Sequence, residues 1–172
     1  MTKQISAKEI IDGLKLMPHP EGGFFREVHR SPMTVKHPSP PANETPTRAA
    51  MTSIYFLLEG SDFSAFHRVR SDETWHLYGG GPLELHMLSQ KGEYERRILG
   101  FDLGAGYTPQ ITIPAMSWQA ACPAPNVSYA LCGCTVAPGF DFVDFKMVSF
   151  RELSLSYPQH EDLIRRFTRG PR

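Results

Sequence analysis

The chain has 172 residues, 41% of them hydrophobic and 21% charged, which is typical of a globular protein and argues against a disordered or fibrous one. This length suits one domain, which we expect to span residues 1–172. Lys plus Arg and Asp plus Glu number 18 each, so no net positive charge would attract nucleic acid or an anionic membrane surface. We therefore expect neither as a partner.

The amino-terminal residues predict a short helix followed by a strand. Ser6 and Glu9 have the spacing of a capping box, and Pro18 ends the apolar periodicity behind them. Two glycines then turn the chain into the alternating stretch GFFREVHR, which is typical of a strand. The helix region lacks the apolar run of a secretion signal, and no segment has the roughly 18 apolar residues of a membrane span.

Residues 31–48 contain five prolines among polar side chains. Proline removes backbone donors and fixes φ, so this composition excludes a helix or a central strand and predicts a long loop or arm. Such a segment can be a lid over a site or a passive surface excursion, and the sequence favours neither.

From residue 50 onward the sequence predicts a series of short strands. Runs rich in β-branched and aromatic residues alternate with Gly, Pro, Asn, Asp and Ser turn signals: MTSIYFLLE, FSAFHRV, TWHLYG, LELHMLS, YERRIL, QITIP, WQAAC, VSYALCGCTV and FDFVDF. Strands without intervening helices indicate an all-β sandwich or barrel. Ser149 and Glu152 form a second capping box, and we expect the terminal helices to pack outside the barrel.

Three cysteines, Cys122, Cys132 and Cys134, are too few and too oddly numbered for a disulfide framework. Small buried thiols in a reducing compartment are the simpler interpretation, so we expect a cytoplasmic location.

His67 and Glu73 form the most informative pair. A histidine near the end of one strand meets a carboxylate near the start of the next across a tight turn, and alternation places Phe63, Ala65, His67 and Val69 on one face. Such a pair can provide a general base or half of a metal site. A buried histidine that bonds a glutamate for structure alone is the alternative.

The segment around this pair resembles the first cupin motif, with Gly60, His67, Glu73 and Gly80 in matching places and one extra residue after the first glycine. Val69 stands where that motif has its second histidine. The second cupin motif corresponds to residues 114–119, where Gln119 replaces the histidine.

The resemblance to a small, largely uncharacterised cupin family covers nearly the whole chain, through EGGFFREVHRS, SIYFLLEG, FHRVRSDETWHLYGGGPLELHML, LGFDL, TPQITIPAMSWQAA and CTVAPGFDFVDF. It implies a cupin-type antiparallel β-barrel, or jelly roll, with short terminal helices. It also implies a homodimer and a fold similar to that of dTDP-sugar epimerases, without a settled reaction.

The ligand count argues against an obligatory metal. Metal-binding cupins use three histidines and a glutamate, whereas only His67 and Glu73 match here and Gln119 is a poor ligand for first-row metals. We therefore expect no metal, although His76 could complete a divalent site if the strand start is distorted. Ideal alternation places His76 on the face opposite Glu73.

Other polar and aromatic residues could complete a ligand pocket. Tyr55 is a candidate acid opposite a His67 base. Trp75 and Trp118 could form pocket walls, and Gln110 could hold a ligand hydroxyl. His76 and Gln119 are further candidate ligand-binding residues. Arg26 could meet an anionic group, as the resemblance suggests for the segment that contains it. For each, a core, edge or surface role is an open alternative.

Three functions stay open from the sequence. The first is a small-molecule cupin without obligatory metal, which binds a sugar or nucleotide-sugar and catalyses its epimerisation or isomerisation with His67 and Glu73. The second is a metal-dependent cupin that uses His67, Glu73 and His76. The third is a non-catalytic ligand-binding or assembly module.

Overall fold

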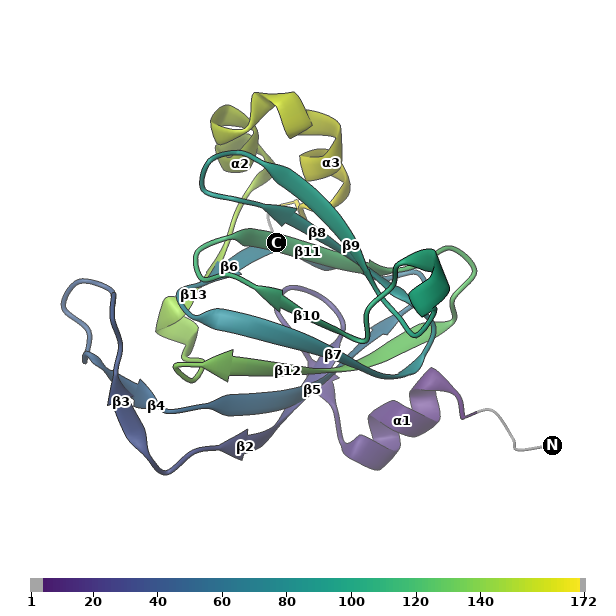
Figure 1. The fold of residues 1–172 in the computed structure, drawn as a ribbon, viewed down its shortest axis with the longest axis horizontal. Helices are drawn as coiled ribbons and strands as arrows, with labels where there is room; N and C mark the ends of the chain where they lie inside the picture. Colours follow the sequence, from purple (N-terminus) through teal and green to yellow (C-terminus); the bar gives the residue numbers. More distant parts are fainter. Residues whose placement is uncertain (1–4, 171–172) are drawn as a thin grey trace.

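The computed structural model describes residues 5–170 and consists mainly of antiparallel strands in two facing sheets (Figure 1). The six-stranded sheet contains, in spatial order, β1 (Met17–Pro18), β2 (Phe24–Arg30), β5 (Thr52–Glu59), β12 (Tyr129–Ala137), β7 (Asp72–Gly80) and β10 (Gln110–Ile113). The five-stranded sheet contains β13 (Phe145–Met147), β6 (Ser64–Val69), β11 (Trp118–Pro123), β8 (Leu83–Leu88) and β9 (Tyr94–Leu99). The predicted all-β barrel of cupin type is confirmed.

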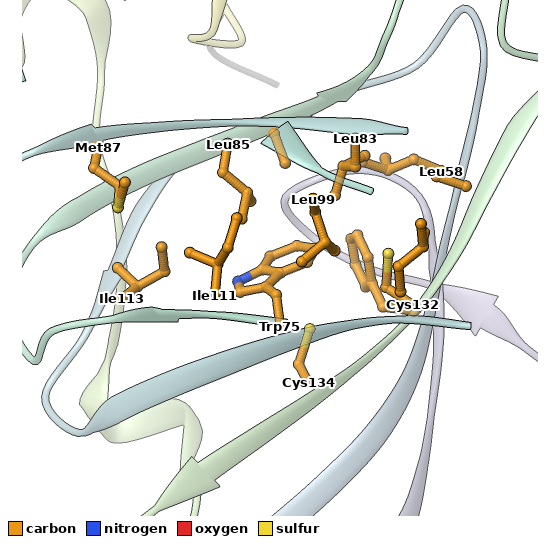
Figure 2. Close-up of a cluster of buried hydrophobic side chains, with 14 residues drawn as sticks. Leu58, Trp75, Leu83, Leu85, Met87, Leu99, Ile111, Ile113, Cys132 and Cys134 are labelled. Atoms are coloured by element: carbon orange, nitrogen blue, oxygen red, sulfur yellow. The ribbon is translucent and has the colours of Figure 1, made fainter. Parts of the chain in front are cut away.

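The space between the sheets is filled by apolar side chains that alternate inward from both layers. Figure 2 shows Leu83, Leu85 and Met87 of the five-stranded sheet facing Trp75 and Ile111 of the six-stranded sheet. All of these side chains are at least nine-tenths buried. The core adjoins the cavity, because Phe56, Trp75 and Cys134 belong to both.

Short helices cover the outside, as predicted. The helices are α1 (Ala7–Leu14), α2 (Phe150–Ser156) and α3 (Glu161–Arg166), with 3₁₀ turns at Leu103–Ala105, Phe142–Asp144 and Pro158–His160. Both predicted caps are present, because Ser6 Oγ accepts from Glu9 N and Ser149 Oγ accepts from Glu152 N. In Figure 1, α2 and α3 lie beyond the five-stranded sheet, where a second apolar cluster includes Phe167. Among residues 5–170, no helix is long and apolar enough to span a membrane.

The proline-rich segment differs partly from its predicted loop. It is an arm whose two short strands, β3 (Thr34–Lys36) and β4 (Thr47–Ala49), pair antiparallel. The prolines lie outside these strands, so the pairing loses no proline donor. Arg48 anchors the arm through a buried two-point ion pair with Asp144, at 2.6 and 3.1 Å.

Strand β6 also departs from ideal alternation. Gln119 pairs with His67 but Ala121 pairs with Ser64, so β6 spends one extra residue in a bulge. Ideal alternation would place Ser64 on the face of Phe66 and Arg68. The bulge instead turns it to the face of His67. The three cysteines are free and buried, as the sequence predicts.

Candidate functional site

A cavity opens between the sheets beside β2, β5 and β13, and both sheets contribute to its wall. Its empty space amounts to about 840 Å³ when counted out to the solvent at the mouth. The wall is mainly apolar and aromatic, and one group of titratable side chains interrupts it. The lining residues are His19, Glu21, Phe25, Glu27, Arg30, Thr52, Ile54, Phe56, His67, Val69, Glu73, Trp75, Cys134, Val136, Phe140, Asp141, Phe142 and Phe145.

His67 lies in this cavity and is 2% exposed. Its Nδ1 is 2.8 Å from the carbonyl oxygen of Ala65, which can only accept, so Nδ1 carries the proton of the neutral ring. Burial lowers the pKa of His67 although Glu73 acts in the opposite direction. The ring is therefore neutral near pH 7, and its Nε2 keeps a free lone pair.

Glu21 contacts His67 on the Nδ1 side. Its Oε2 is 3.3 Å from Nδ1 of both His67 and His19, and its Oε1 accepts a 2.8 Å hydrogen bond from Ser64 Oγ. Complete burial raises the pKa of Glu21 to about 8, although Ser64 and the Arg169 charge act against that rise. The carboxyl group is therefore largely protonated at neutral pH.

His19 completes this group and lies in the loop between β1 and β2. Burial lowers its pKa to about 3, and the nearby His67 acts in the same direction. Its ring also packs edge-on against Phe25, at 4.6 Å between centroids. An imidazole in this environment is neutral, so it adds a polar but uncharged surface.

Glu73 is held from the other sheet by Gln119. The Gln119 amide donates a 2.6 Å hydrogen bond to Glu73 Oε2, and its carbonyl accepts a 3.0 Å hydrogen bond from Trp75 Nε1. Burial raises the pKa of Glu73, against the opposing influence of His67. His67 and Glu73, the predicted pair, both line the cavity and influence each other's pKa. The Nδ1 atom of His67 contacts Ala65 and Glu21 and not Glu73.

The mouth of the cavity has a ring of aromatic side chains and a neutralised cation. Phe140, Phe142 and Phe145 pack at 5.1 to 6.1 Å between centroids. Arg30 donates to both carboxylate oxygens of Glu27, at 3.0 and 2.7 Å, and Nη2 also bonds the Phe140 carbonyl. The only arginine among the described residues that line this cavity is therefore already paired.

Three predicted site residues lie on the outer face of the six-stranded sheet instead of in the cavity. Ile54 and Phe56 line the cavity, so Tyr55 between them points away, where the Arg26 guanidinium lies 5.8 Å from its ring centroid. His76 bonds Thr135 Oγ1 at 3.2 Å on the same outer face. The expectations that Tyr55 supplies an acid and Arg26 an anion site in this cavity are therefore corrected, because strand alternation directs both outward.

Gln110 and Trp118 also lie outside the cavity. Gln110 is exposed at the start of β10, opposite His76. Trp118 belongs to the apolar cluster beneath α2 and α3, with the Arg68 guanidinium 4.6 Å from its ring centroid. Of the predicted ligand-binding residues, the structure brings Trp75 to the cavity wall and Gln119 behind Glu73.

The cavity residues do not fit the divalent metal ion that metal-binding cupins hold. His76 faces away, Val69 offers no ligand atom, and the Gln119 amide is bonded to both Glu73 and Trp75. Among the described residues of this cavity, no three His, Cys, Asp or Glu ligand atoms come within 4.8 Å of one another. These side chains therefore do not form the site of three histidines and one glutamate that metal-binding cupins use.

Sequence reasoning missed Glu21 and His19. Both precede the strand that was predicted, in the turn HPEGG, and two glycines with φ of 117° and 68° form that turn. A carboxylate fixed between a proline and two glycines was the signal available, since such a turn is rigid enough to aim it.

Comparisons with known proteins agree with this architecture. A family model described as "Cupin superfamily (DUF985)" matches residues 8–148. The chain is similar to an uncharacterised protein of Saccharomyces cerevisiae, YML079W, with 30% identity across 81% of this chain and 73% of the yeast protein.

Solved structures of other proteins have the same fold. A hypothetical protein from Leishmania major has 34% identity and a TM-score of 0.89, over 96% of this chain and 100% of that one. A protein from Shewanella oneidensis has 36% identity and a TM-score of 0.87, over 98% of this chain and 100% of that one. Oxalate decarboxylase of Bacillus subtilis shares the fold alone, at 12% identity and a TM-score of 0.53, over 87% of this chain and 36% of that one. The chain belongs to the cupin superfamily, in the family defined as DUF985.

Proposed function

We propose that the cavity binds a small neutral polyhydroxyl compound with a carbonyl group, a sugar or a close analogue, and isomerises it by proton transfer without a metal. The observation that carries this proposal is the group of buried titratable side chains on the cavity wall. Their environments leave His67 without a proton on Nε2 and shift the carboxyl groups of Glu21 and Glu73 toward their protonated forms.

These protonation states suit a base and an acid that work together. Nε2 of His67 takes the proton from the carbon next to the carbonyl group, the C–H electron pair forms the new C=C bond, and the carbonyl π pair moves to the oxygen. The Glu73 carboxyl donates its proton to that oxygen and gives an enol. Glu73, now a carboxylate, takes the proton of the neighbouring hydroxyl group, and His67 returns its proton to the former carbonyl carbon. The carbonyl group has then moved by one position, and both side chains are back in their starting states.

Glu21 has a positioning role in this scheme. It contacts the Nδ1 side of His67, so its protonated form helps to hold the ring without raising the basicity of Nε2 through charge. Ser64 keeps the carboxyl group in place through its 2.8 Å hydrogen bond.

The charges at the mouth favour a neutral sugar over a nucleotide-sugar. Arg30 is paired with Glu27, and Asp141 adds a further negative charge among the lining residues. A diphosphate needs unpaired cations or backbone donors, and among residues 5–170 this entrance offers it no free guanidinium. The aromatic ring at the mouth suits the apolar face of a sugar ring.

Deuterium exchange tests the proposal. The protein is first screened against sugars and sugar acids by thermal shift, because a ligand raises Tm by mass action. Compounds that bind are then incubated with the protein in D₂O and examined by NMR. We expect deuterium to enter next to the carbonyl group with the wild type and with His29→Asn, an exposed control, and not with His67→Asn or Glu73→Gln.

The outcomes separate the functions. Exchange that persists in His67→Asn contradicts the base assignment. A ligand that stabilises the protein without exchange would make the cavity a binding module, which contradicts catalysis.

The oligomeric state and the cellular location are two further proposals, and each rests on features outside the cavity. We propose a homodimer, since Glu27–Arg30 of β2 form an exposed sheet edge that a second copy could extend, and sedimentation velocity measures its mass. We also propose a cytoplasmic location, since three free buried thiols suit a reducing compartment. Fractionation of cells tests that location.

A further inference from the structure

A second cluster of chemically reactive side chains lies outside the cavity, on the outer face of the five-stranded sheet. Strand β8 contributes Glu84 and His86, and β11 contributes Cys122, which pairs directly with Glu84. Because the intervening leucines point into the core, these side chains face the opposite side, where Figure 1 shows α3 above β8, β9 and β11. The cluster is therefore separate from the proposed catalytic cavity.

The cluster brings three kinds of ligand atom together. A carboxylate oxygen of Glu84, an imidazole nitrogen of His86 and the sulfur of Cys122 all lie within 4.8 Å of one another. The three residues are 7%, 3% and 7% exposed. Oxygen, nitrogen and sulfur ligands in one buried group match the preferences of Zn²⁺, which accepts all three in a tetrahedral arrangement.

An unpaired nitrogen of His86 is independent evidence for a ligand at this cluster. Its Nε2 is buried without a hydrogen-bond partner among residues 5–170, at 3.5 Å from Glu84 Oε2. A buried polar atom without a partner costs about 1–3 kcal/mol. Nδ1 is 2.9 Å from the Tyr94 hydroxyl, which fixes the ring so that Nε2 points toward Glu84 and Cys122.

The chemistry of the three side chains is compatible with a cation. A carboxylate and a neutral imidazole offer lone pairs directly, and the Cys122 thiol loses its proton on metal binding.

Two arginines border the cluster and oppose a cation. Arg96 donates to both carboxylate oxygens of Glu84, from Nη2 to Oε1 at 2.6 Å and from Nε to Oε2 at 3.3 Å. Oε2 also lies 3.5 Å from His86 Nε2, and its second lone pair is the one available to a cation. Arg166 Nη2 lies 3.7 Å from Cys122 Sγ and must move aside. Arg166 is exposed at the end of α3, so its side chain has room to leave.

We propose that Glu84, His86 and Cys122 bind one Zn²⁺ ion, with a water molecule as the fourth ligand. The ion joins β8 to β11 beneath α3, and Arg166 covers the thiol when the site is empty of metal.

Zinc titration of the full chain, after dialysis against a chelator, tests this site by calorimetry. We expect one ion per chain and one proton released, which buffers of different ionisation enthalpy reveal. With Co²⁺ in place of Zn²⁺, a sulfur-to-cobalt charge-transfer band reports the thiolate directly.

Substitutions assign the ligands. Cys122→Ser should abolish the charge-transfer band, and His86→Gln should weaken binding by about 10- to 100-fold or more. Cys132→Ser, a buried thiol on the inner face, and His67→Asn in the cavity should leave binding and the band unchanged. Arg166→Ala leaves all three ligand side chains in place and should tighten binding, since it removes a positive charge and the cover of the thiol.

Three results would overturn the site: no binding of one equivalent by the wild type, binding that survives both Cys122→Ser and His86→Gln, or weaker binding in Arg166→Ala. Because His67→Asn is expected to abolish exchange but not zinc binding, failure of the proposed catalysis and failure of this site are distinguishable.

Discussion

Glu21 has a consequence for stability that depends on pH. Its pKa is about 8 in the folded protein and near 4.5 when unfolded, so between these values the folded state holds a proton that the unfolded state has lost. Folding is therefore favoured by this group below pH 4.5, and its contribution falls as pH rises toward 8. Within that window the slope approaches about 1.4 kcal/mol per pH unit.

Glu21→Gln removes this dependence, because glutamine resembles the protonated carboxyl group and cannot ionise. We expect the free energy of unfolding of the variant, relative to wild type, to rise between pH 5.5 and pH 7.5 in urea titrations. Glu95→Gln, an exposed control on β9, should show no such change. Parallel stability curves for Glu21→Gln and wild type would contradict the raised pKa.

Gln119 has a structural role that the resemblance to a metal ligand position does not suggest. Its amide satisfies Glu73 and Trp75 at once, and all three side chains are buried. Gln119→Leu leaves a carboxyl oxygen and an indole N–H without partners, so we expect a loss of about 2–4 kcal/mol in the free energy of unfolding. Gln110→Leu, at an exposed position, should change it by about 0.5 kcal/mol or less. Equal losses in both variants would refute the bridging role.

These residues also show what the sequence could predict. Alternation placed Glu73 and Trp75 inward and His76 outward, because regular strands have a period of two. It could not place Ser64, whose orientation depends on a bulge that only the pairing with β11 reveals. The link from Glu21 to His67 joins residues far apart in the chain, so no local pattern encodes it.

At the scale of elements, the loop between β1 and β2 aims Glu21 into the cavity. Gly23 has φ of 68°, and a Cβ there would lie 2.6 Å from the Leu57 carbonyl oxygen and 2.9 Å from Leu58 Cδ2. A larger residue must displace backbone atoms of β5, so the turn depends on this glycine.

Gly23→Ala should therefore lower the free energy of unfolding by about 1–3 kcal/mol and reduce the exchange activity proposed for the cavity. Gly13→Ala is the matched change, in α1 with no atom within 4 Å of its Cβ, and should raise stability by about 0.5–1 kcal/mol. Guanidinium denaturation of both variants checks these signs. A neutral Gly23→Ala would show that the turn tolerates a side chain.

At the scale of the whole molecule, Arg169 ties the carboxyl-terminal segment to the turn that holds Glu21. Its guanidinium donates to the Glu21 carbonyl at 3.1 Å and to Asp62 Oδ1 and the Phe63 carbonyl at 2.6 Å each. Asp62 in turn accepts a 2.8 Å hydrogen bond from Gly23 N. One side chain thus links three segments at the base of the cavity.

Arg169→Ala should cost about 2 kcal/mol in urea denaturation, because it leaves partly buried acceptors without donors. It should also raise the pKa of Glu21 further, since the Arg169 charge lowers it. Lys8→Ala, which removes an exposed pair with Asp12 within α1, should leave the free energy of unfolding nearly unchanged. Similar effects of the two variants would deny Arg169 its linking role.

The link through Arg169 also constrains the order of events during synthesis. The Glu21 carbonyl and the Arg169 guanidinium are 148 positions apart. The turn that carries Glu21 therefore leaves the ribosome long before Arg169 is synthesised. Until then, the turn lacks the hydrogen bonds that Arg169 donates. A ribosome stalled before residue 169 should display a β-rich nascent chain whose acid–base cavity is not yet competent to hold a ligand.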